Sequence, residues 1–420
     1  MEYIVVNGEK CLEGSVNISG AKNAAVAILP AAIASGGICV IDNLPHVEDV
    51  VNLVKAMESL GAICKFTDRN TVIVDATKVT GHVLSDAAVK STRASYYFMG
   101  ALLGRFGAAE VPLPGGCDLG VRPIDYHLKG FSALGVECTQ EHGVVKLRAE
   151  KLKGANIYLD SPSVGATINI MIAAAFAEGV SLIENSAKEP HVVDVANFLN
   201  KLGAKISGAG TATIRVTGVK KLGGGEYTVI PDPIETGTYM IAAAITGGDV
   251  TVENIIPKHM EALSSKLREM GCDVEEGGDW VRVKGTKSLK ACEVKTAYYP
   301  GFPTDLQPQM ATLLCKAQGT SIITENIFEH RFRYTNELKR IGGQLKVDGR
   351  MAVTKGNCRF SGAKVVATDL RAGAAMIIAG LAAEGETMIS GVKHIDRGYD
   401  NFEEKFRAIG ADIRRVKTDD

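Results

Sequence analysis

One pattern of apolar and polar positions occurs six times along the chain. Each copy begins with a nearly all-apolar, alanine-rich run, passes through a glycine and a short β-like run, and ends with an amphipathic run closed by a hydrophobic residue and a glycine. The closing glycines lie 68 to 74 residues apart and are Gly61, Gly135, Gly203, Gly271, Gly342 and Gly410. A fixed period of this length predicts a fold built from copies of one supersecondary unit.

The two longer runs of each unit predict two different kinds of helix. The first run is apolar on nearly every side, which predicts a helix that is buried all round. These runs occupy residues 24–34, 96–103, 168–177, 239–245, 310–317 and 374–383. The second run, as in Val47, Val50 and Val54, has an apolar stripe at steps of three and four residues. It predicts a surface helix with one face inward, and with polar residues such as Asp49 outside that stripe.

Six buried helices are difficult to pack around one axis, so two groups of three are expected. Short β-like runs, such as 38–41 and 71–74, indicate strands beside the helices. The segment 226–233 contains two prolines and lies between the third and fourth units, which makes it the expected crossing between two α/β domains. One long α/β solenoid is the alternative, because counting repeats does not exclude it.

Composition narrows the class of protein. Lys and Arg number 47 and Asp and Glu number 48, so no global field draws the chain to nucleic acid or to a membrane surface. The first ten residues lack the layout of a signal peptide, and Pro30 interrupts the apolar run from Ala24 before it reaches membrane-spanning length. Nine cysteines without C-x-x-C or metal-ligand spacing are typical of thiols in a reducing compartment. We therefore expect a cytoplasmic protein that needs no metal and no cofactor.

Polar residues gather where the buried helices begin. Four of these helices follow a residue that can cap a helix N-terminus, namely Ser163, Asp232, Asp305 and Asp369. Capping is the expected role at most of these positions. Three units place a cation at the same point, namely Lys22, Arg93 and Arg371. Because a cation there opposes the helix macrodipole, it predicts an anion such as a phosphate or a carboxylate beside it.

A second group of cations follows the β-turns of the units, and its members are Arg122, Arg331, Arg333 and Arg397. Arg333 is expected to be a solvated surface charge. If two domains face each other with their turns inward, the other cations converge with the helix N-termini on one cleft. That cleft would be lined by Lys22, Arg93, Arg122, Arg331, Arg371 and Arg397. Its expected content is a polyanionic small molecule, such as a phosphorylated sugar, a nucleotide or a carboxylate-phosphate.

The second unit alone has an enlarged turn, which ends in Gly115, Gly116 and Cys117. Arg122 follows five positions later, and neighbouring cations lower the pKa of a thiol. Cys117 is therefore a candidate nucleophile or general acid. Cysteines within strand or helix patterns are expected to be structural, and these are Cys39, Cys64, Cys138, Cys272, Cys292 and Cys315. Three histidines are expected to be solvated at the outer helices or to cap them, namely His127, His191 and His259.

Several segments, taken in order, resemble one known family. They are Gly20-Ala21-Lys22-Asn23-Ala24, Pro114-Gly115-Gly116-Cys117 through Arg122-Pro123, Ser163-Val164-Gly165-Ala166-Thr167, Pro300-Gly301-Phe302-Pro303-Thr304-Asp305-Leu306-Gln307, Glu325-Asn326-Ile327-Phe328-Glu329 and Asp369-Leu370-Arg371-Ala372-Gly373. Through them the whole chain resembles the UDP-N-acetylglucosamine 1-carboxyvinyltransferases, the enolpyruvyl transferases that open bacterial peptidoglycan synthesis.

The resemblance implies an α/β fold, the two-domain inside-out α/β barrel of the enolpyruvyl transferases, with six internal repeats. One domain would comprise residues 21–230 with repeats one to three and the cysteine loop. The other would comprise residues 1–20 and 231–420 with repeats four to six, and the active site would lie in the cleft between them. The implied partners are two small molecules, phosphoenolpyruvate and UDP-N-acetylglucosamine, with no nucleic acid and no membrane insertion. The enolpyruvyl group would pass to the sugar 3-hydroxyl with release of phosphate.

The resemblance also implies roles for single residues. Cys117 would act as general acid or form a covalent adduct, and Asp305 would be the base near the sugar hydroxyl. The groups that hold phosphoenolpyruvate would be Lys22, Arg122 and Arg397, with Arg93 nearby and with Asp369 and Arg371 supporting the site. The nucleotide sugar would contact Asn23, Arg122, Pro123, Ile124, Asp125, Ser163, Val164, Gly165, Ile327 and Phe328, with Arg331 close by. The Cys117 loop would close over the bound sugar nucleotide.

Two stretches depart from the family pattern. Residues 329–334 read Glu-His-Arg-Phe-Arg-Tyr where the family reads Glu-Asn-Arg-Phe-Met-His, which leaves Arg331 in place but changes its neighbours. Ser161 and Pro162 replace a Lys-Val pair that some members use beside the nucleotide. One contact to the uridine diphosphate is therefore expected to be absent or to come from the backbone.

Two rival functions stay open on the sequence. The first is the shikimate-pathway enolpyruvyl transferase of the same fold, against which Cys117 and Asn23 argue. The second is a catalytically silent protein that only binds a sugar nucleotide. The combination against it is Lys22, Cys117, Asp305 and Arg397.

Overall fold

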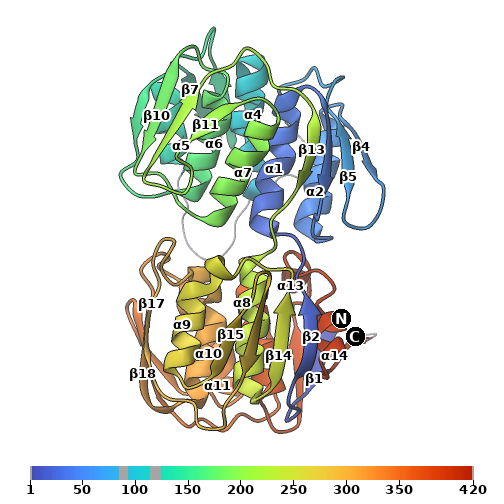
Figure 1. Cartoon of the computed structure of the whole chain (residues 1–420), viewed down its shortest axis with the longest axis vertical. Helices are drawn as coiled ribbons and strands as arrows, with labels where there is room; N and C mark the ends of the chain where they lie inside the picture. The colour runs from blue at the N-terminus through green and yellow to red at the C-terminus, as the bar shows by residue number, and fades with distance from the viewer. Residues whose placement is uncertain (1, 85–92, 114–123, 419–420) are drawn as a thin grey trace. The chain divides into compact units, whose positions relative to one another are not determined.

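The computed structural model describes residues 2–84, 93–113 and 124–418. Contacts divide the chain into two compact units, with one boundary between Ser19 and Gly20 and another between Ile230 and Pro231. The first unit is formed by the described residues between 20 and 230. The second unit is formed by the described residues up to 19 and from 231 onward (Figure 1).

Each unit has three central helices that contact one another. In the first unit these helices are α1 (Lys22–Ser35), α4 (Tyr97–Phe106) and α6 (Val164–Ala174). In the second unit they are α8 (Pro233–Thr246), α10 (Gln307–Lys316) and α12 (Leu370–Leu381). Two groups of three mutually packed helices confirm the predicted arrangement and exclude a continuous solenoid.

Amphipathic helices cover each central group. They are α2 (Glu48–Ser59), α5 (Asp125–Ala133) and α7 (Pro190–Lys201) in the first unit, and α9 (Glu261–Glu269), α11 (Thr335–Arg340) and α14 (Phe402–Ala408) in the second. Short helical turns precede several longer helices or lie between them, namely η1 (Arg93–Tyr96), η2 (Pro257–Met260), η3 (Thr304–Leu306), η4 (Arg331–Tyr334) and α13 (Lys393–Asp396).

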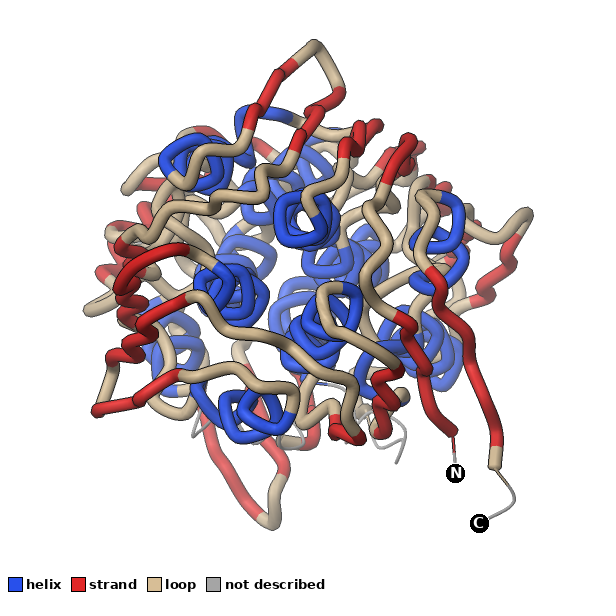
Figure 2. Tube along the Cα trace, turned by 90° about the horizontal axis from the view of Figure 1, so that it is seen from below, coloured by secondary structure: helices blue, strands red, loops and turns tan. Residues whose placement is uncertain are grey.

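The strands of the described residues form six small sheets, one for each repeat, and Figure 2 shows them mainly outside the helices. The first sheet of the first unit has the strand order β13 (Gly225–Thr228), β3 (Ile38–Asp42), β5 (Val72–Asp75), β4 (Ile63–Phe66). The second has the order β6 (Ala108–Pro112), β8 (Val144–Arg148), β7 (Glu137–Glu141). The third has the order β11 (Lys205–Ser207), β12 (Thr213–Thr217), β10 (Val180–Glu184), β9 (Asn156–Tyr158). The first sheet of the second unit has the strand order β15 (Asp273–Glu276), β16 (Trp280–Lys284), β14 (Asp249–Glu253), β2 (Glu13–Asn17). The second has the order β17 (Glu293–Lys295), β18 (Gln318–Thr324), β20 (Met351–Gly356), β19 (Leu345–Asp348). The third has the order β21 (Lys364–Val366), β22 (Glu386–Ser390), β1 (Glu2–Asn7), β23 (Asp412–Lys417).

The same pairing rule holds in every four-stranded sheet. One outer strand runs parallel to its neighbour, and the remaining pairs are antiparallel, as in β13 parallel to β3 and β3 antiparallel to β5. The N-terminal strands β1 and β2 complete sheets of the second unit, and β13 completes the first sheet of the first unit. Distant segments of the chain therefore close each unit on itself.

Burial of the central helices follows from their composition. In α1 every residue from Ala24 to Ser35 is buried, and small alanine side chains let the neighbouring helices approach closely. The buried helix predicted over residues 24–34 is confirmed, and α1 continues through Pro30 as one helix. The proline removes one donor, and the surrounding helices hold the segment in place. No helix in the described part of the chain is long and apolar enough to cross a membrane.

The six closing glycines share one backbone conformation. Their φ angles lie between 87° and 106°, a region that favours glycine because it has no Cβ. After α2, for example, the Gly61 N–H donates to the Glu58 carbonyl and the Ala62 N–H donates to the Met57 carbonyl, which is a Schellman motif. The same pair of bonds follows each of the other five outer helices. The repeated hydrophobic-Gly signature is therefore a helix stop.

The chain leaves the second unit at Ser19, which is held by a buried ion pair. The Ser19 N–H donates to Glu235 Oε2 at 2.9 Å, and Lys405 Nζ donates to Glu235 Oε1 and to Ser19 Oγ, each at 2.6 Å. Burial raises the pKa of Glu235 to about 7, against the lowering effect of Lys405. The Asp232 N–H donates to the Ser19 carbonyl at 2.9 Å, so both crossing segments are anchored at one place in this unit.

Close approach of α4 and α6 yields a stability prediction. A methyl group at Gly100 of α4 would lie 2.4 Å from the Asn169 carbonyl oxygen of α6, whereas one at Gly81 would meet nothing within 4 Å. We expect Gly100→Ala to lower the free energy of unfolding by about 1–3 kcal/mol, because the helices must move apart. Gly81→Ala should stay within about 1 kcal/mol of wild type. Urea denaturation measures both, and equal stability of the two variants would contradict the packing argument.

Candidate active site

Asp305 lies in η3, directly before the central helix α10, and two arginines hold its carboxylate. Arg331 Nη2 lies 3.1 Å from Asp305 Oδ1, while Arg371 Nε and Nη2 lie 3.2 and 3.0 Å from Oδ2. The arginine side chains are 2% and 4% exposed, and the Asp305 side chain is 28% exposed. The two buried arginines thus fix the Asp305 carboxylate on one side, and its other side reaches solvent.

The two guanidinium groups carry more charge than one carboxylate neutralises. Burial alone would lower the pKa of Arg371, but Asp305 and Tyr399 raise it above its usual value, so Arg371 stays charged. Arg371 lies over the Tyr399 ring at 5.4 Å, and Arg331 lies 5.7 Å from the Phe328 ring. Arg331 Nε and Arg371 Nη1 are buried and have no hydrogen-bond partner among the described residues. The cluster therefore suits an anionic ligand.

Three of the four predicted capping residues do cap their helices. Ser163 accepts from the Ala166 N–H, Asp232 accepts from two N–H groups at the start of α8, and Asp369 accepts from the Arg371 and Ala372 N–H groups. Asp305 is the exception, because α10 begins without a side-chain cap and the Asp305 carboxylate binds arginines instead. Among these four residues, Asp305 is therefore the candidate for a role in the reaction, because its side chain does not cap a helix.

Lys22 is the first residue of α1, where its charge opposes the helix macrodipole. Its ammonium lies 2.8 Å from Asp49 Oδ2 at the start of α2. The anion predicted beside Lys22 is thus provided by the protein. Asp49, which was expected outside the apolar stripe on the surface of α2, is buried, so that expectation was wrong. The buried carboxylate offsets the macrodipole cost and holds Lys22 in place.

Residues predicted to contact the nucleotide sugar lie at helix N-termini of the first unit. Asn23 is half-buried in the first turn of α1, Ile124 caps α5, and Asp125 is exposed at its start. Ser163 caps α6, and Val164 and Gly165 form its first turn. Backbone N–H groups at such ends bind phosphate oxygens well.

His127, expected to be solvated or to cap α5, is instead buried, so the prediction was wrong. Its side chain is held by Asn169, whose Nδ2 lies 3.0 Å from His127 Nδ1 and also donates to the Tyr96 carbonyl. A methyl group at Gly165 would lie 3.0 Å from the Tyr96 hydroxyl and 3.1 Å from the His127 ring. The Tyr96–His127–Asn169 group therefore packs directly under the start of α6. Burial lowers the pKa of His127 to about 3, so the ring is neutral.

In the second unit, one buried carboxylate organises the predicted loop residues Ile327 and Phe328. Their N–H groups donate to Glu325 Oε1 at 2.8 and 3.0 Å. Glu325 lies within one of the motifs that carry the family resemblance, but the resemblance implies no role for it. A glutamate followed within three residues by a turn was the available signal, because such a side chain can accept from the N–H groups that follow it.

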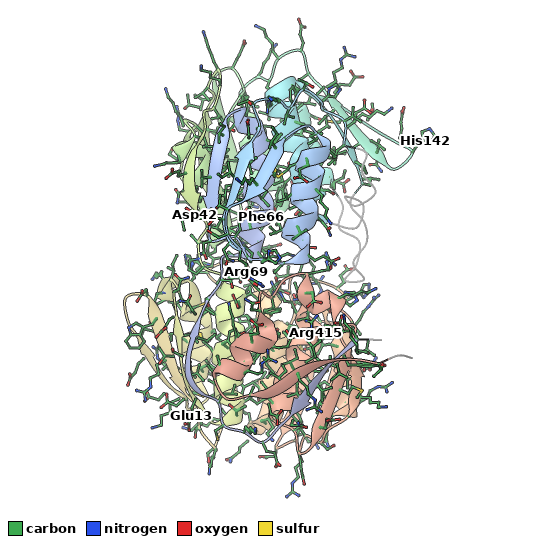
Figure 3. All side chains as sticks on the ribbon, turned by 90° about the vertical axis from the view of Figure 1, so that its right-hand side faces the viewer. Glu13, Asp42, Phe66, Arg69, His142 and Arg415 are labelled. Carbon is green, nitrogen blue, oxygen red and sulfur yellow. The ribbon has the colours of Figure 1, made fainter. Side chains whose placement is uncertain are left out.

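Arg397 is half-buried at the C-cap of the short helix α13. The preceding residue, Asp396, is held at 2.6 Å by Arg415 of β23, which is labelled in Figure 3. Arg415 also binds Glu403 of α14 at 2.6 Å. Exposed ion pairs of this kind contribute little stability but fix the local geometry of α13.

Three predicted site residues, Cys117, Arg122 and Pro123, lie outside the described residues, as does the side chain of Arg93. Arg93 itself begins η1. Arg333, expected as a surface charge, is exposed.

The eight described cysteines are free thiols. Burial raises the pKa of Cys64 to about 12, and that of Cys272 and Cys292 to about 11. Burial also raises the pKa of Cys39 and Cys138. These thiols are poor nucleophiles near neutral pH. Cys11, by contrast, is exposed.

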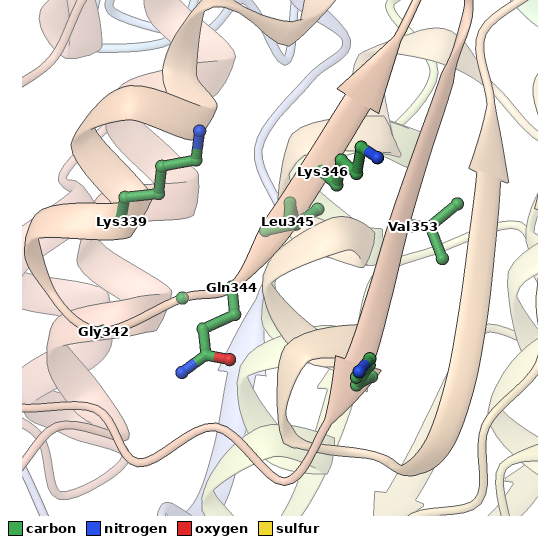
Figure 4. A pocket seen from close by; sticks show the side chains of 8 residues that line it. Lys339, Gly342, Gln344, Leu345, Lys346 and Val353 are labelled. Carbon is green, nitrogen blue, oxygen red and sulfur yellow. The ribbon is translucent and has the colours of Figure 1, made fainter.

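A groove of about 580 Å³ lies between α11 and the strands β19 and β20 (Figure 4). It is lined by Lys339, Gly342, Gly343, Gln344, Leu345, Lys346, Val353 and Lys355. None of these is a predicted site residue, and the three lysines are exposed. The groove is separate from the Asp305 cluster in its residues and carries no part of the candidate chemistry.

Comparisons with known proteins identify the family of the chain. The sequence model of the EPSP synthase (3-phosphoshikimate 1-carboxyvinyltransferase) family matches residues 6–406. UDP-N-acetylglucosamine 1-carboxyvinyltransferase 2 of Clostridium acetobutylicum is 56% identical over 99% of this chain and 100% of its own. The protein of the same name from Bacillus subtilis is 51% identical over 100% of this chain and 98% of its own. The chain belongs to the UDP-N-acetylglucosamine 1-carboxyvinyltransferase family.

A solved structure supports the fold as well. The enolpyruvyl transferase NikO from Streptomyces tendae superposes with a TM-score of 0.90 at 27% identity, over 99% of each chain. The predicted two-domain inside-out α/β barrel of the enolpyruvyl transferases is therefore confirmed as the fold class.

The buried neutral His127 predicts a pH dependence of stability. Its folded pKa of about 3 lies below the unfolded value of about 6.5, so the unfolded state binds more protons between these values. Stability is therefore lost as pH falls below about 6.5, and we expect a loss of about 2 kcal/mol from this group between pH 7.5 and pH 5. His127→Gln should remove that part of the loss in urea titrations.

His142→Asn is the matched control, because His142 is exposed at a positive φ that asparagine tolerates. It should keep the pH dependence of wild type. If His127→Gln and His142→Asn show the same slope, His127 is not the group that titrates.

Proposed function

We propose that the protein transfers the enolpyruvyl group of phosphoenolpyruvate to the 3-hydroxyl of UDP-N-acetylglucosamine and releases phosphate. The observation that carries the proposal is the match of nearly the whole chain to relatives named for this reaction, at 51% and 56% identity. The charged cluster around Asp305 supports it, because the donor carries both a carboxylate and a phosphate. The reaction is the first committed step of peptidoglycan synthesis, and the site of action is the cytoplasm.

The reaction explains why cations and a carboxylate are needed together. The sugar hydroxyl adds to C2 of phosphoenolpyruvate, its proton leaves the oxygen, and C3 gains a proton. The resulting tetrahedral ketal then loses phosphate, and a proton leaves C3 to restore the double bond. Positive charge develops at C2 between two anionic groups, so fixed cations and dipoles lower the barrier most effectively.

We assign the roles as follows. Asp305 accepts the hydroxyl proton as the new C–O bond forms, and Arg331 and Arg371 hold its carboxylate in place for that step. Cys117 delivers the proton to C3 or bonds covalently to the donor. Lys22, Arg122 and Arg397 hold the donor's anionic groups, with Arg93 nearby.

The remaining residues position the acceptor. Asp369 keeps the start of α12 in place for Arg371 by capping the helix. The groups proposed to contact the sugar nucleotide are Asn23, Arg122, Pro123, Ile124, Asp125, Ser163, Val164, Gly165, Ile327 and Phe328. Closure of the Cys117 loop over them excludes water from the reacting centre.

Acceptor choice tests the proposal directly. Purified protein with phosphoenolpyruvate should release phosphate when UDP-N-acetylglucosamine is added and should not when shikimate 3-phosphate is added. The family sequence model is named for the second acceptor, so the comparison is a fair one. Phosphate release with shikimate 3-phosphate alone would replace the proposed activity by that of the other enzyme, and release with neither would leave a binding protein.

Chemical labelling tests the role of Cys117. An epoxide phosphonate such as fosfomycin should alkylate Cys117 and stop turnover, and more rapidly when the sugar nucleotide is bound. Exposed Cys11 is an internal control, because its thiol is accessible but has no assigned role. Peptide mass spectrometry locates the adduct, and a phosphate-release assay measures the remaining turnover. Full activity with no adduct on Cys117, or an adduct on Cys11 instead, would refute the assignment.

A further inference from the structure

We infer that Glu325 is a positioning residue that sets Asp305 and the Ile327–Phe328 turn in register with each other. The inference rests on the proposed function, because it concerns how that reaction's base and acceptor loop are held. Glu325 follows strand β18 and is completely buried. It is not itself among the residues assigned to contact the substrates.

The Glu325 carboxylate has donors on both oxygens. Oε2 accepts from the Thr304 hydroxyl at 2.9 Å, and Thr304 immediately precedes Asp305 in η3. Oε1 accepts from the N–H groups of Ile327 and Phe328 at 2.8 and 3.0 Å and from the Thr296 hydroxyl at 3.0 Å. One side chain therefore ties three segments together, namely the end of β17, η3 and the turn after β18.

These contacts form a closed path of residues around Asp305, the proposed base. From Glu325 the path runs through the Phe328 backbone to its side chain, which lies 5.7 Å from the Arg331 guanidinium. Arg331 binds the Asp305 carboxylate, and Thr304 returns the path to Glu325. Asp305 is thus held by its side chain through Arg331 and by its backbone through Thr304. A shift of Glu325 moves both supports at once.

Neighbouring bonds stiffen the turn. Thr296 Oγ1 accepts from the Asn326 N–H at 2.9 Å, and Asn326 Nδ2 donates to the Thr296 carbonyl at 3.0 Å. On the other side the Glu325 N–H donates to the Arg350 carbonyl, and Arg350 Nη1 donates to the Asn326 carbonyl. The turn is therefore fixed from the residue after β17 and from the turn between β19 and β20, and among these groups Glu325 is the one bonded to η3 through its side chain.

The chemistry of the position favours a carboxylate. All four partners of the Glu325 side chain donate to it, and a carboxylate accepts at both oxygens. Glutamine has nearly the same shape but puts an NH₂ donor in place of one oxygen. Opposite the Ile327 and Phe328 N–H groups this NH₂ would leave buried hydrogen bonds unmade, and opposite Thr304 it would reverse the hydrogen bond. Displacements of about 1 Å at a reacting group can cost about 100-fold in rate. Glu325→Gln is therefore a sharp probe of positioning.

The test separates the two arms of Glu325. Thr304→Val removes only the arm that reaches Asp305, and we expect kcat to fall about 10- to 100-fold with the KM for UDP-N-acetylglucosamine within about twofold of wild type. Thr304→Ser keeps the hydroxyl and should restore kcat to within about threefold of wild type. Glu325→Gln disturbs both arms, so it should lower kcat and raise that KM.

Glu293→Gln is the matched control, because Glu293 is an exposed glutamate on β17 of the same sheet. It should leave kcat and KM at wild-type values. Should Thr304→Val and Glu325→Gln lower only the melting temperature and leave kcat and KM unchanged, Glu325 is structural and the inference is wrong. Equal losses in Thr304→Ser and Thr304→Val would also overturn it, because the hydroxyl would then be irrelevant.

Hydrogen exchange gives a readout that does not depend on the acceptor. In Glu325→Gln and in Thr304→Val, peptides covering residues 304–306 and 325–328 should exchange faster, while peptides from β21 and β22 should not change. Inactivity of the wild-type protein with UDP-N-acetylglucosamine would refute the proposed function and leave this result to decide the positioning role. Unchanged exchange in both peptides of Glu325→Gln would refute the positioning role, whatever the acceptor.

Discussion

The fold depends on six central helices that lack a solvent-facing polar side. Such a helix must be surrounded, and three of them packed together surround one another only in part. The amphipathic helices and small sheets of each unit supply the rest of the cover, and they place their own polar faces outward. The closing glycines then turn the chain back at the same point in all six copies.

This packing limits the positions at which the central helices can carry charged side chains. In the described central helices the charged side chains lie in the first or last turn, while neutral polar groups such as Asn169 are buried along them and hydrogen-bonded. Ser163, Asp232 and Asp369 use the helix start to satisfy backbone N–H groups, which is a structural task. Asp305 occupies the corresponding place before α10 but binds two buried arginines. Asp305, the proposed base, thus occupies a position at which α6, α8 and α12 have a side-chain cap.

Buried charges in both units are held by partners from other elements. Lys22 is paired with Asp49 of α2, Glu235 with Lys405 of α14, and Asp305 with Arg331 and Arg371. Removing one partner of such a pair leaves an unpaired buried charge, which costs several kcal/mol. A variant at Lys22 therefore changes the packing of Asp49 as well as any ligand contact, and its effects on affinity and on stability have to be measured together.

The sequence alone determined the repeat, the two kinds of helix and the family, because apolar periodicity and ordered motifs are local properties of the chain. It also identified Asp305, Arg331 and Arg371, although not that they form one cluster. It misjudged Asp49 and His127, whose burial depends on neighbours distant along the chain: Lys22 for Asp49, and Asn169 and Tyr96 for His127. The role of Glu325 was likewise invisible, since its partners Thr296 and Thr304 are brought to it by the pairing of β17 with β18 and by the start of α10. Burial and hydrogen bonding across such separations are decided only when the chain has folded, because each requires surfaces that no single segment contains.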